Sequence, residues 1–151
     1  MNIHGGDIYR NHVDIDFSIN VNPLGTPECV KEALHKAVEM CGKYPDIEAE
    51  RLGEAISTFL GVPKEYLIFG NGASELFMAI VHGIKPGKVV IPVPSFYGYE
   101  YAAKSVDCEI IYYEMNQENN FCLEDEMKHI LTEDVNLLFL ANPNNPIGNL
   151  L

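Results

Sequence analysis

The stretch that decides the fold is Tyr66-Leu67-Ile68-Phe69-Gly70-Asn71-Gly72-Ala73-Ser74-Glu75. Its short apolar run ends abruptly in two glycines, and a largely apolar segment with helical spacing follows. This change of period predicts a strand over 66–69, a glycine turn and a helix over 73–82 that ends at Gly83. The outward-facing amides of Ala73 and Ser74, together with the Ser74 hydroxyl, would favour an anion such as phosphate. An ordinary tight turn explains the same residues equally well, and the segment matches neither a Rossmann fingerprint nor a Walker A loop.

Helix and strand alternate along the chain on both sides of this turn. Before it, the pattern predicts a helix starting at Thr26-Pro27 and stopping at Gly42, and a helix capped by Asp46 and closed by Gly61. After it come predicted strands over 88–93, 109–113 and 135–140 and predicted helices over 96–104 and 123–131. Near-continuous apolar strands between helices predict an α/β fold, a mainly parallel sheet with helices on both faces.

The first 25 residues lack helical periodicity and are expected to form an extended arm ending in the turn Asn22-Pro23-Leu24-Gly25. Residues 26–151 read as one incomplete large domain, because the strand predicted at 135–140 should be followed by a covering helix. We therefore interpret the sequence as the front part of a longer protein.

Composition excludes several classes of function. The 151 residues carry 10 Lys plus Arg against 22 Asp plus Glu, a net charge of −12, which disfavours nucleic acids and anionic membranes as partners. The sequence contains neither a membrane-span pattern nor a signal-peptide pattern, so we expect a cytoplasmic protein. The four cysteines show no CxxC spacing, which predicts reduced, mostly buried thiols, with Cys122 in the core, and no structural metal.

Two further loops follow predicted strands. Pro94-Ser95-Phe96-Tyr97-Gly98-Tyr99 offers an aromatic ring, and Asn142-Pro143-Asn144-Asn145-Pro146-Ile147-Gly148 offers an amide on a backbone restricted by two prolines. Because the carboxyl ends of parallel strands meet at one edge, both loops should face the same crevice as Ala73. Each loop alone is explained by covering of the sheet edge, but the three together predict a binding site.

The three segments GNGASE, PSFYGY and ANPNNPIG resemble, in this order, those of pyridoxal-phosphate enzymes of aminotransferase class I/II, fold type I. The resemblance spans nearly the whole chain. Three more segments are similar to the branch that contains threonine-phosphate decarboxylase and histidinol-phosphate aminotransferase, and the HGGD opening favours the decarboxylase: His4-Gly5-Gly6-Asp7, residues 16–25 and Tyr44-Pro45-Asp46.

The resemblance implies pyridoxal 5′-phosphate as cofactor, a phosphorylated amino acid or amine as substrate, and a homodimer. By this resemblance Gly72, Ala73 and Ser74 would bind the cofactor phosphate, Phe96 would stack on its ring, and Asn145 would bond its phenolic oxygen. Tyr44 would reach the phosphate of the neighbouring subunit's cofactor, and His4, Asn20 and Asn22 would lie near the substrate. Ile147 departs from the family's usual threonine, which removes one hydroxyl.

A larger departure concerns catalysis. The family needs a Schiff-base lysine, an aspartate for the ring nitrogen and arginines for the phosphate and the substrate carboxylate, all downstream of the third segment in relatives. None of the eight lysines here has the Ser-x-Ser/Thr-Lys context, and the arginines are only Arg10 and Arg51. We therefore assign no catalytic residue and expect residues 1–151 alone to be inactive. Two other interpretations stay open: a non-catalytic phosphate- or nucleotide-binding module, and a structural fragment that self-associates through exposed sheet edges.

Overall fold

A computed structural model describes residues 5–150, so the predicted substrate residue His4 lies outside the described residues. The chain divides into two compact units, Met1–Phe69 and Gly70–Leu151. Each unit is described by itself below.

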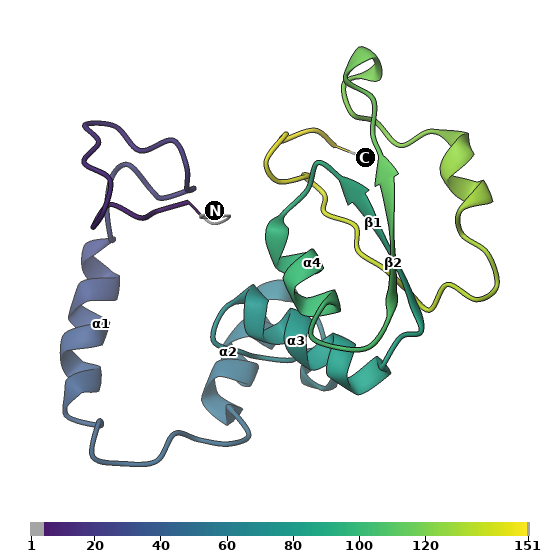
Figure 1. Cartoon of the computed structure of the whole chain (residues 1–151). Helices are drawn as coiled ribbons and strands as arrows, with labels where there is room; N and C mark the ends of the chain where they lie inside the picture. The colour runs from purple at the N-terminus through teal and green to yellow at the C-terminus, as the bar shows by residue number, and fades with distance from the viewer. Residues whose placement is uncertain (1–4, 151) are drawn as a thin grey trace. The chain divides into compact units, whose positions relative to one another are not determined.

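The second unit contains a three-stranded parallel sheet in the order β2-β1-β3. Its strands are β1 (Lys88–Val93), β2 (Glu109–Glu114) and β3 (Leu137–Leu138). β1 pairs with β2 along its whole length, and Figure 1 shows the two arrows side by side and pointing the same way. β3 pairs only through Leu137 and Leu138, opposite Val89 and Val90. The predicted α/β fold with a parallel sheet is therefore confirmed.

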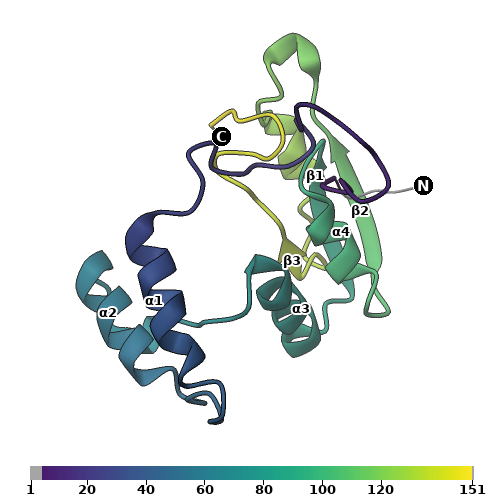
Figure 2. The same ribbon diagram turned by 90° about the vertical axis from the view of Figure 1, so that its left-hand side faces the viewer.

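The side chains of β1 alternate between two hydrophobic clusters, one on each face of the sheet. Val89 and Ile91 pack against the helices α3 (Ala73–Ile84) and α4 (Tyr97–Ala103). Val90 faces the opposite way and packs with Met127 and its neighbours. The second face is covered by η3 (Asp125–His129), which follows the short turn η2 (Gln117–Asn119). Figures 1 and 2 both show α4 on one side of the sheet and the segment around η3 on the other.

Over residues 5–69 the first unit contains two α-helices, α1 (Glu28–Val38) and α2 (Glu50–Leu60), followed by the 3-10 turn η1 (Lys64–Tyr66). α2 and η1 lie close together, since an added Cβ on the buried Gly53 would lie 2.9 Å from Cε of Lys64. The arm folds back on itself rather than running extended, because the Gly6 amide donates to Oγ of Ser18 at 2.9 Å. The predicted turn after Asn22 is confirmed by the bond from the Gly25 amide to the Asn22 carbonyl, at 2.9 Å.

Several predicted elements differ in extent or type. The strand predicted over 66–69 is wrong: the chain there leaves η1 and forms no ladder. The α-helix predicted over 123–131 is a 3-10 helix, and the strand predicted over 135–140 pairs at two residues only. α1 ends at Val38, before Gly42, and α3 runs one residue past Gly83. The run 66–69 is neither paired nor buried, since Tyr66 and Ile68 are 77% and 73% exposed, so an apolar run forms a strand only where a neighbouring strand is available to pair with it.

Helix ends follow the predicted residues only in part. Asp46 accepts hydrogen bonds from the amides of Glu48 and of Glu50, the first residue of α2, at 3.1 and 2.8 Å, but the N-cap position of α2 is Ala49 rather than the predicted Asp46. Gly61 closes the same helix with φ of 67°, a left-handed conformation that glycine adopts without strain. The predicted N-cap Thr26 is wrong by one residue, because Pro27 occupies the N-cap position of α1.

The cysteine prediction is half correct. All four thiols are free, but Cys29, Cys41 and Cys122 are exposed and Cys108 is half-buried, so the prediction of buried thiols is wrong. Cys122 lies in the turn after η2 rather than in the core, because Leu123 and Phe121 fill the cluster beside it. Within residues 5–150 no helix is long and apolar enough to cross a membrane, and no group of acidic, histidine and cysteine side chains has the arrangement of a metal site.

Candidate functional site

The turn before α3 presents backbone donors. Gly72 has φ of 86°, which favours glycine, and its amide donates to the Gly70 carbonyl at 2.9 Å. The amides of Ala73 and Ser74 open α3 and donate to no acceptor among the described residues. The Ser74 side chain is exposed beside them. The structure thus brings together the predicted anion donors, at the positive end of a helix of three turns.

Phe96 lies at the N-cap of α4, directly after the carboxyl end of β1. Its half-buried ring stands edge-on to Tyr99, with centroids 5.7 Å apart, and tilted against Phe77 at 6.3 Å. Tyr99 in turn stacks on Phe139 at 4.9 Å, and burial raises the pKa of its phenol. The Phe96 ring therefore rests on a rigid aromatic layer and keeps part of its surface open.

The third loop is held by Asn144 rather than by the predicted Asn145. Nδ2 of Asn144 donates to the Pro94 carbonyl at 3.0 Å, and this asparagine is only 5% exposed. Its backbone binds Asn149 and Gly148, which closes the loop on itself. Asn145 is exposed, so its amide is available to a ligand.

These contacts connect the three loops. Phe77, one helical turn after Ala73, touches the Phe96 ring, and Asn144 ties the third loop to the residue that precedes Ser95. A small hollow of about 10 Å³ lies where the second and third loops meet, and its lining includes Ser95, Phe139 and Asn144. The second and third loops lie together after their strands, as predicted. The first loop follows no strand, so its position does not follow from the shared edge of parallel strand ends; it meets the second loop through the contact of Phe77 with Phe96.

The remaining predicted site residues belong to the first unit. Tyr44 is 97% exposed, and Asn20 is exposed as well. The Asn22 side chain is used within its own turn, where Oδ1 accepts from the Leu24 amide and Nδ2 donates to the Gly25 carbonyl, each at 3.0 Å. A substrate contact by Asn22 would therefore require this turn to open.

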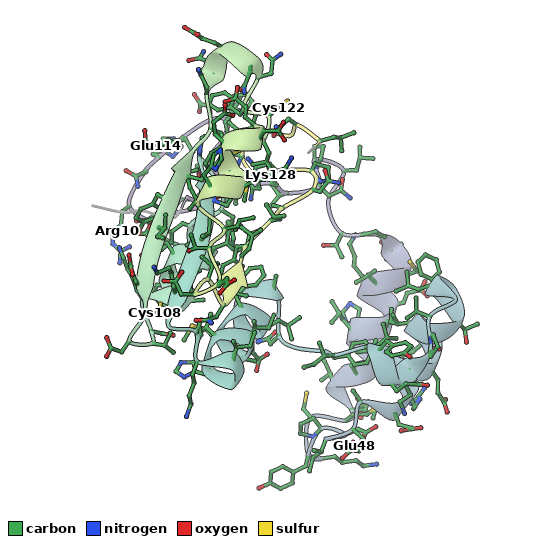
Figure 3. The ribbon with its side chains drawn as sticks, turned by 90° about the vertical axis from the view of Figure 1, so that its right-hand side faces the viewer. Arg10, Glu48, Cys108, Glu114, Cys122 and Lys128 are labelled. Atoms are coloured by element: carbon green, nitrogen blue, oxygen red, sulfur yellow. The ribbon has the colours of Figure 1, made fainter. Side chains whose placement is uncertain are left out.

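The lysines of the second unit lie away from the three loops. Lys88, at the amino end of β1, pairs with Asp134 and Glu109, and Lys104 and Lys128 pair with acidic residues on their own helices. Figure 3 shows the sheet edge opposite the loops, where Cys108 precedes β2, and the other end of the strand at Glu114. In the same view Lys128 lies on the segment that covers the second face of the sheet.

Two residues that position the site were missed in the sequence. Consecutive asparagines give no signal of which one is buried, so the sequence does not single out Asn144. Gly98 belongs to the second loop, and an added Cβ there would lie 2.2 Å from Cε1 of Phe96. The sequence does contain one signal for Gly98: a glycine two residues after an aromatic residue, at the start of a predicted helix, indicates that the ring packs against the helix backbone.

An α/β domain with these three loops is of the kind that holds a phosphorylated planar group. Anion donors, an aromatic ring and a free amide on one edge fit the phosphate, the ring and a ring oxygen of such a group. The family model of aminotransferase class I and II matches residues 13–151. The chain belongs to this family, as the resemblance predicted.

Individual relatives agree with the family. The chain is 36% identical over 134 residues to threonine-phosphate decarboxylase from Salmonella typhimurium, covering 89% of the chain and 37% of the relative. The structure of histidinol-phosphate aminotransferase from Clostridium acetobutylicum superposes with a TM-score of 0.71 at 30% identity, over 85% of this chain and 38% of that one. The enzyme of the same name from Sinorhizobium meliloti, solved in complex with pyridoxal-5′-phosphate, has the same fold, with a TM-score of 0.72 at 23% identity over 82% and 34%. The chain thus spans somewhat more than a third of the length of these relatives.

Proposed function

We propose that this chain belongs to a pyridoxal-phosphate-dependent enzyme that acts on a phosphorylated amino acid or amine, with threonine-phosphate decarboxylase as the first candidate. The observation that carries the proposal is the pair of amides at Ala73 and Ser74, which have no acceptor within residues 5–150 and lie on the helix whose Phe77 contacts the Phe96 ring. Histidinol-phosphate aminotransferase is the second candidate, since a relative of that name is similar over most of the chain.

In this proposal the residues of the chain hold and orient the cofactor. The Ala73 and Ser74 amides and the Ser74 hydroxyl bind the phosphate, and the flat Phe96 ring restrains the pyridine. Asn145 donates its side-chain amide to the phenolic oxygen. The bound cofactor supplies an electron sink for the bond broken at the substrate's α-carbon. None of these residues distinguishes loss of carboxylate from movement of a proton.

The proposed enzyme is a homodimer in which the first unit contributes to the partner's site. Support comes from Tyr44, 97% exposed, and from Phe17 and Leu24 on the arm, 92% and 93% exposed. Large apolar and aromatic side chains with so little cover are expected to find a protein surface. Sedimentation of the full-length enzyme should show a dimer, and a fully active monomer would refute this part of the proposal.

The cofactor site is tested by Ser74→Ala in the full-length protein. Losing one hydrogen bond to a charged phosphate while the amides remain should weaken cofactor affinity by roughly 1–2 kcal/mol. Ser105→Ala removes a serine hydroxyl just after the carboxyl end of α4, away from the three loops. It is the matched control and should bind pyridoxal phosphate like the wild type. Fluorescence titration with pyridoxal phosphate measures both. Equal affinity in wild type, Ser74→Ala and Phe96→Ala would show that the cofactor is bound elsewhere.

The substrate is tested separately. Release of carbon dioxide from threonine phosphate supports the decarboxylase, and transfer of the amino group from histidinol phosphate to 2-oxoglutarate supports the aminotransferase. Phosphate or nucleotide binding without either reaction would favour a non-catalytic binding module.

A further inference from the structure

The turn that presents the anion donors already holds a carboxylate. Oε2 of Glu75 accepts a hydrogen bond from the backbone amide of Asn71, the residue before Gly72. Glu75 is the third residue of α3, so its side chain folds back over the first turn of its own helix. Among the described residues no cation pairs with this carboxylate.

Gly70 provides the space for this arrangement. An added Cβ at Gly70 would lie 2.8 Å from Cδ2 of Leu76 and 3.1 Å from Oε2 of Glu75. Gly70 is not among the residues with a positive φ, so its backbone does not demand glycine. Glycine is therefore needed at position 70 because a side chain there would collide with Glu75 and Leu76, which fold back over the turn.

Charge alone would make Glu75 a poor choice here. A carboxylate beside a phosphate site repels the phosphate, even though an acidic residue in the first turn stabilises the helix. The hydrogen bond from the Asn71 amide to Glu75 favours phosphate binding instead. It fixes the peptide that leads into Gly72, and so it sets the direction of the Ala73 and Ser74 amides. We propose that Glu75 is a positioning residue for the phosphate-binding turn, and this inference rests on the proposed function.

Two substitutions at Glu75 separate geometry from charge. Glu75→Gln keeps an oxygen acceptor for Asn71 and removes the charge, so phosphate affinity should equal or exceed that of the wild type. Glu75→Ala removes both, and the loosened turn should bind pyridoxal phosphate about tenfold more weakly. Gly70→Ala reaches the same turn from the other side and should behave like Glu75→Ala. Glu126→Ala, an exposed acidic residue in the first turn of η3, is the matched control and should bind like the wild type.

The measurements use the full-length protein. Affinities come from fluorescence titration with pyridoxal phosphate and from competition by inorganic phosphate. Hydrogen exchange at the Asn71 amide, followed by mass spectrometry in the cofactor-free protein, reports the turn without any ligand. We expect faster exchange in Glu75→Ala and Gly70→Ala and wild-type exchange in Glu75→Gln, a rescue that a general loss of helix stability would not produce.

The outcomes separate this inference from the function on which it rests. If the wild type binds neither pyridoxal phosphate nor inorganic phosphate, the proposed function fails and the inference fails with it. If the wild type binds and both Glu75 variants gain affinity, Glu75 acts by charge alone and only the inference is overturned. Equal affinities in wild type, Glu75→Ala and Glu75→Gln overturn it as well.

Discussion

The two units of the chain differ in how far their apolar residues are buried. In the second unit Val81, Val89 and Val90 are completely buried between the sheet and its covering segments. In the first unit α1 buries none of its residues, and Leu34 and Phe59 are 60% and 83% exposed. The helices of both units carry apolar residues at helical spacing in the sequence. The spacing therefore identifies a helix and its apolar face, but it does not show what covers that face.

The contrast also explains where the site forms. The second unit has strands, and the loops that follow them are held by packing on both faces of a sheet. The first unit has two helices and a folded arm with little interior. Its exposed apolar residues become buried only against another surface, which the proposed partner subunit would supply.

Truncation of matched side chains in the two units should give the largest difference. Ile91→Ala removes a buried side chain from β1 and should lower the free energy of unfolding by about 2–4 kcal/mol. Leu34→Ala removes an exposed one from α1 and should change it by less than about 0.5 kcal/mol in the isolated chain. Urea unfolding followed by circular dichroism measures both. Equal losses would mean that α1 is as well packed as the sheet.

The strands predicted from the sequence agree with the structure in the second unit and not in the first. β1 was predicted to the residue and β2 to within one, because each is a continuous apolar run paired with a neighbour along its length. The run 66–69 has a similar composition but no strand beside it, and it forms no ladder. Local pattern cannot distinguish these cases, since pairing is decided by residues far away in the chain.

The candidate site was predicted in outline. The second and third loops could be placed on one edge because parallel strands end together, and the bond from Asn144 to Pro94 confirms this. The first loop follows no strand and meets the second through Phe77 and Phe96, a contact that the sequence did not predict. The positions that hold the loops in shape were not predicted. Asn144, Gly98 and Glu75 act through the backbone or through another side chain, and such roles depend on distances that a sequence does not contain.

Replacing a glycine by alanine at a tightly packed position and at an open position should give the next largest difference in stability. Gly98→Ala would drive a Cβ into the Phe96 ring, where the nearest ring atom lies 2.2 Å away, and should destabilise the second unit by about 1–3 kcal/mol. Gly83→Ala meets no atom within 4 Å inside α3 and should stabilise the protein by about 0.5–1 kcal/mol. Thermal unfolding gives both values, and near-ultraviolet circular dichroism should report the displaced ring in Gly98→Ala only. A neutral Gly98→Ala would contradict the tight packing at the start of α4.

The rates at which cysteine thiols are labelled compare the two units without any substitution. Cys29 and Cys41 are exposed in the first unit, whereas Sγ of Cys108 donates to the Ala103 carbonyl at 3.3 Å. Burial, with a smaller contribution from Asp107, raises the pKa of the Cys108 thiol. Because the thiolate is the reactive form, Cys108 should react about tenfold more slowly with a maleimide at neutral pH. Mass spectrometry of timed samples measures the rates, and denaturation in urea should make them equal. Labelling of folded Cys108 as fast as Cys29 would show that this edge of the sheet is open.

The smallest expected effect is an acid-dependent change in the stability of the second unit. Nζ of Lys88 lies 2.5 Å from Oδ2 of Asp134, and Oγ1 of Thr132 donates to Oδ1 at 2.5 Å. The bond from Lys88, followed by that from Thr132, lowers the pKa of Asp134 from 3.8 to about 2. A carboxylate whose pKa is lower in the folded state adds stability above pH 3.8 and loses it as the pH falls through about 2.

Asp134→Asn should therefore flatten the fall in the free energy of unfolding between these two pH values, measured by urea unfolding at a series of pH values. The change should be small and weaker at high salt, because the carboxylate is exposed to solvent. Asp107→Asn removes an exposed carboxylate outside this cluster and serves as the control. An unchanged acid profile in Asp134→Asn would show that Lys88 does not hold the amino ends of β1 and β3 together through this pair. The two apolar clusters would then carry a larger share of the stability of the second unit, which would sharpen the contrast with the first unit.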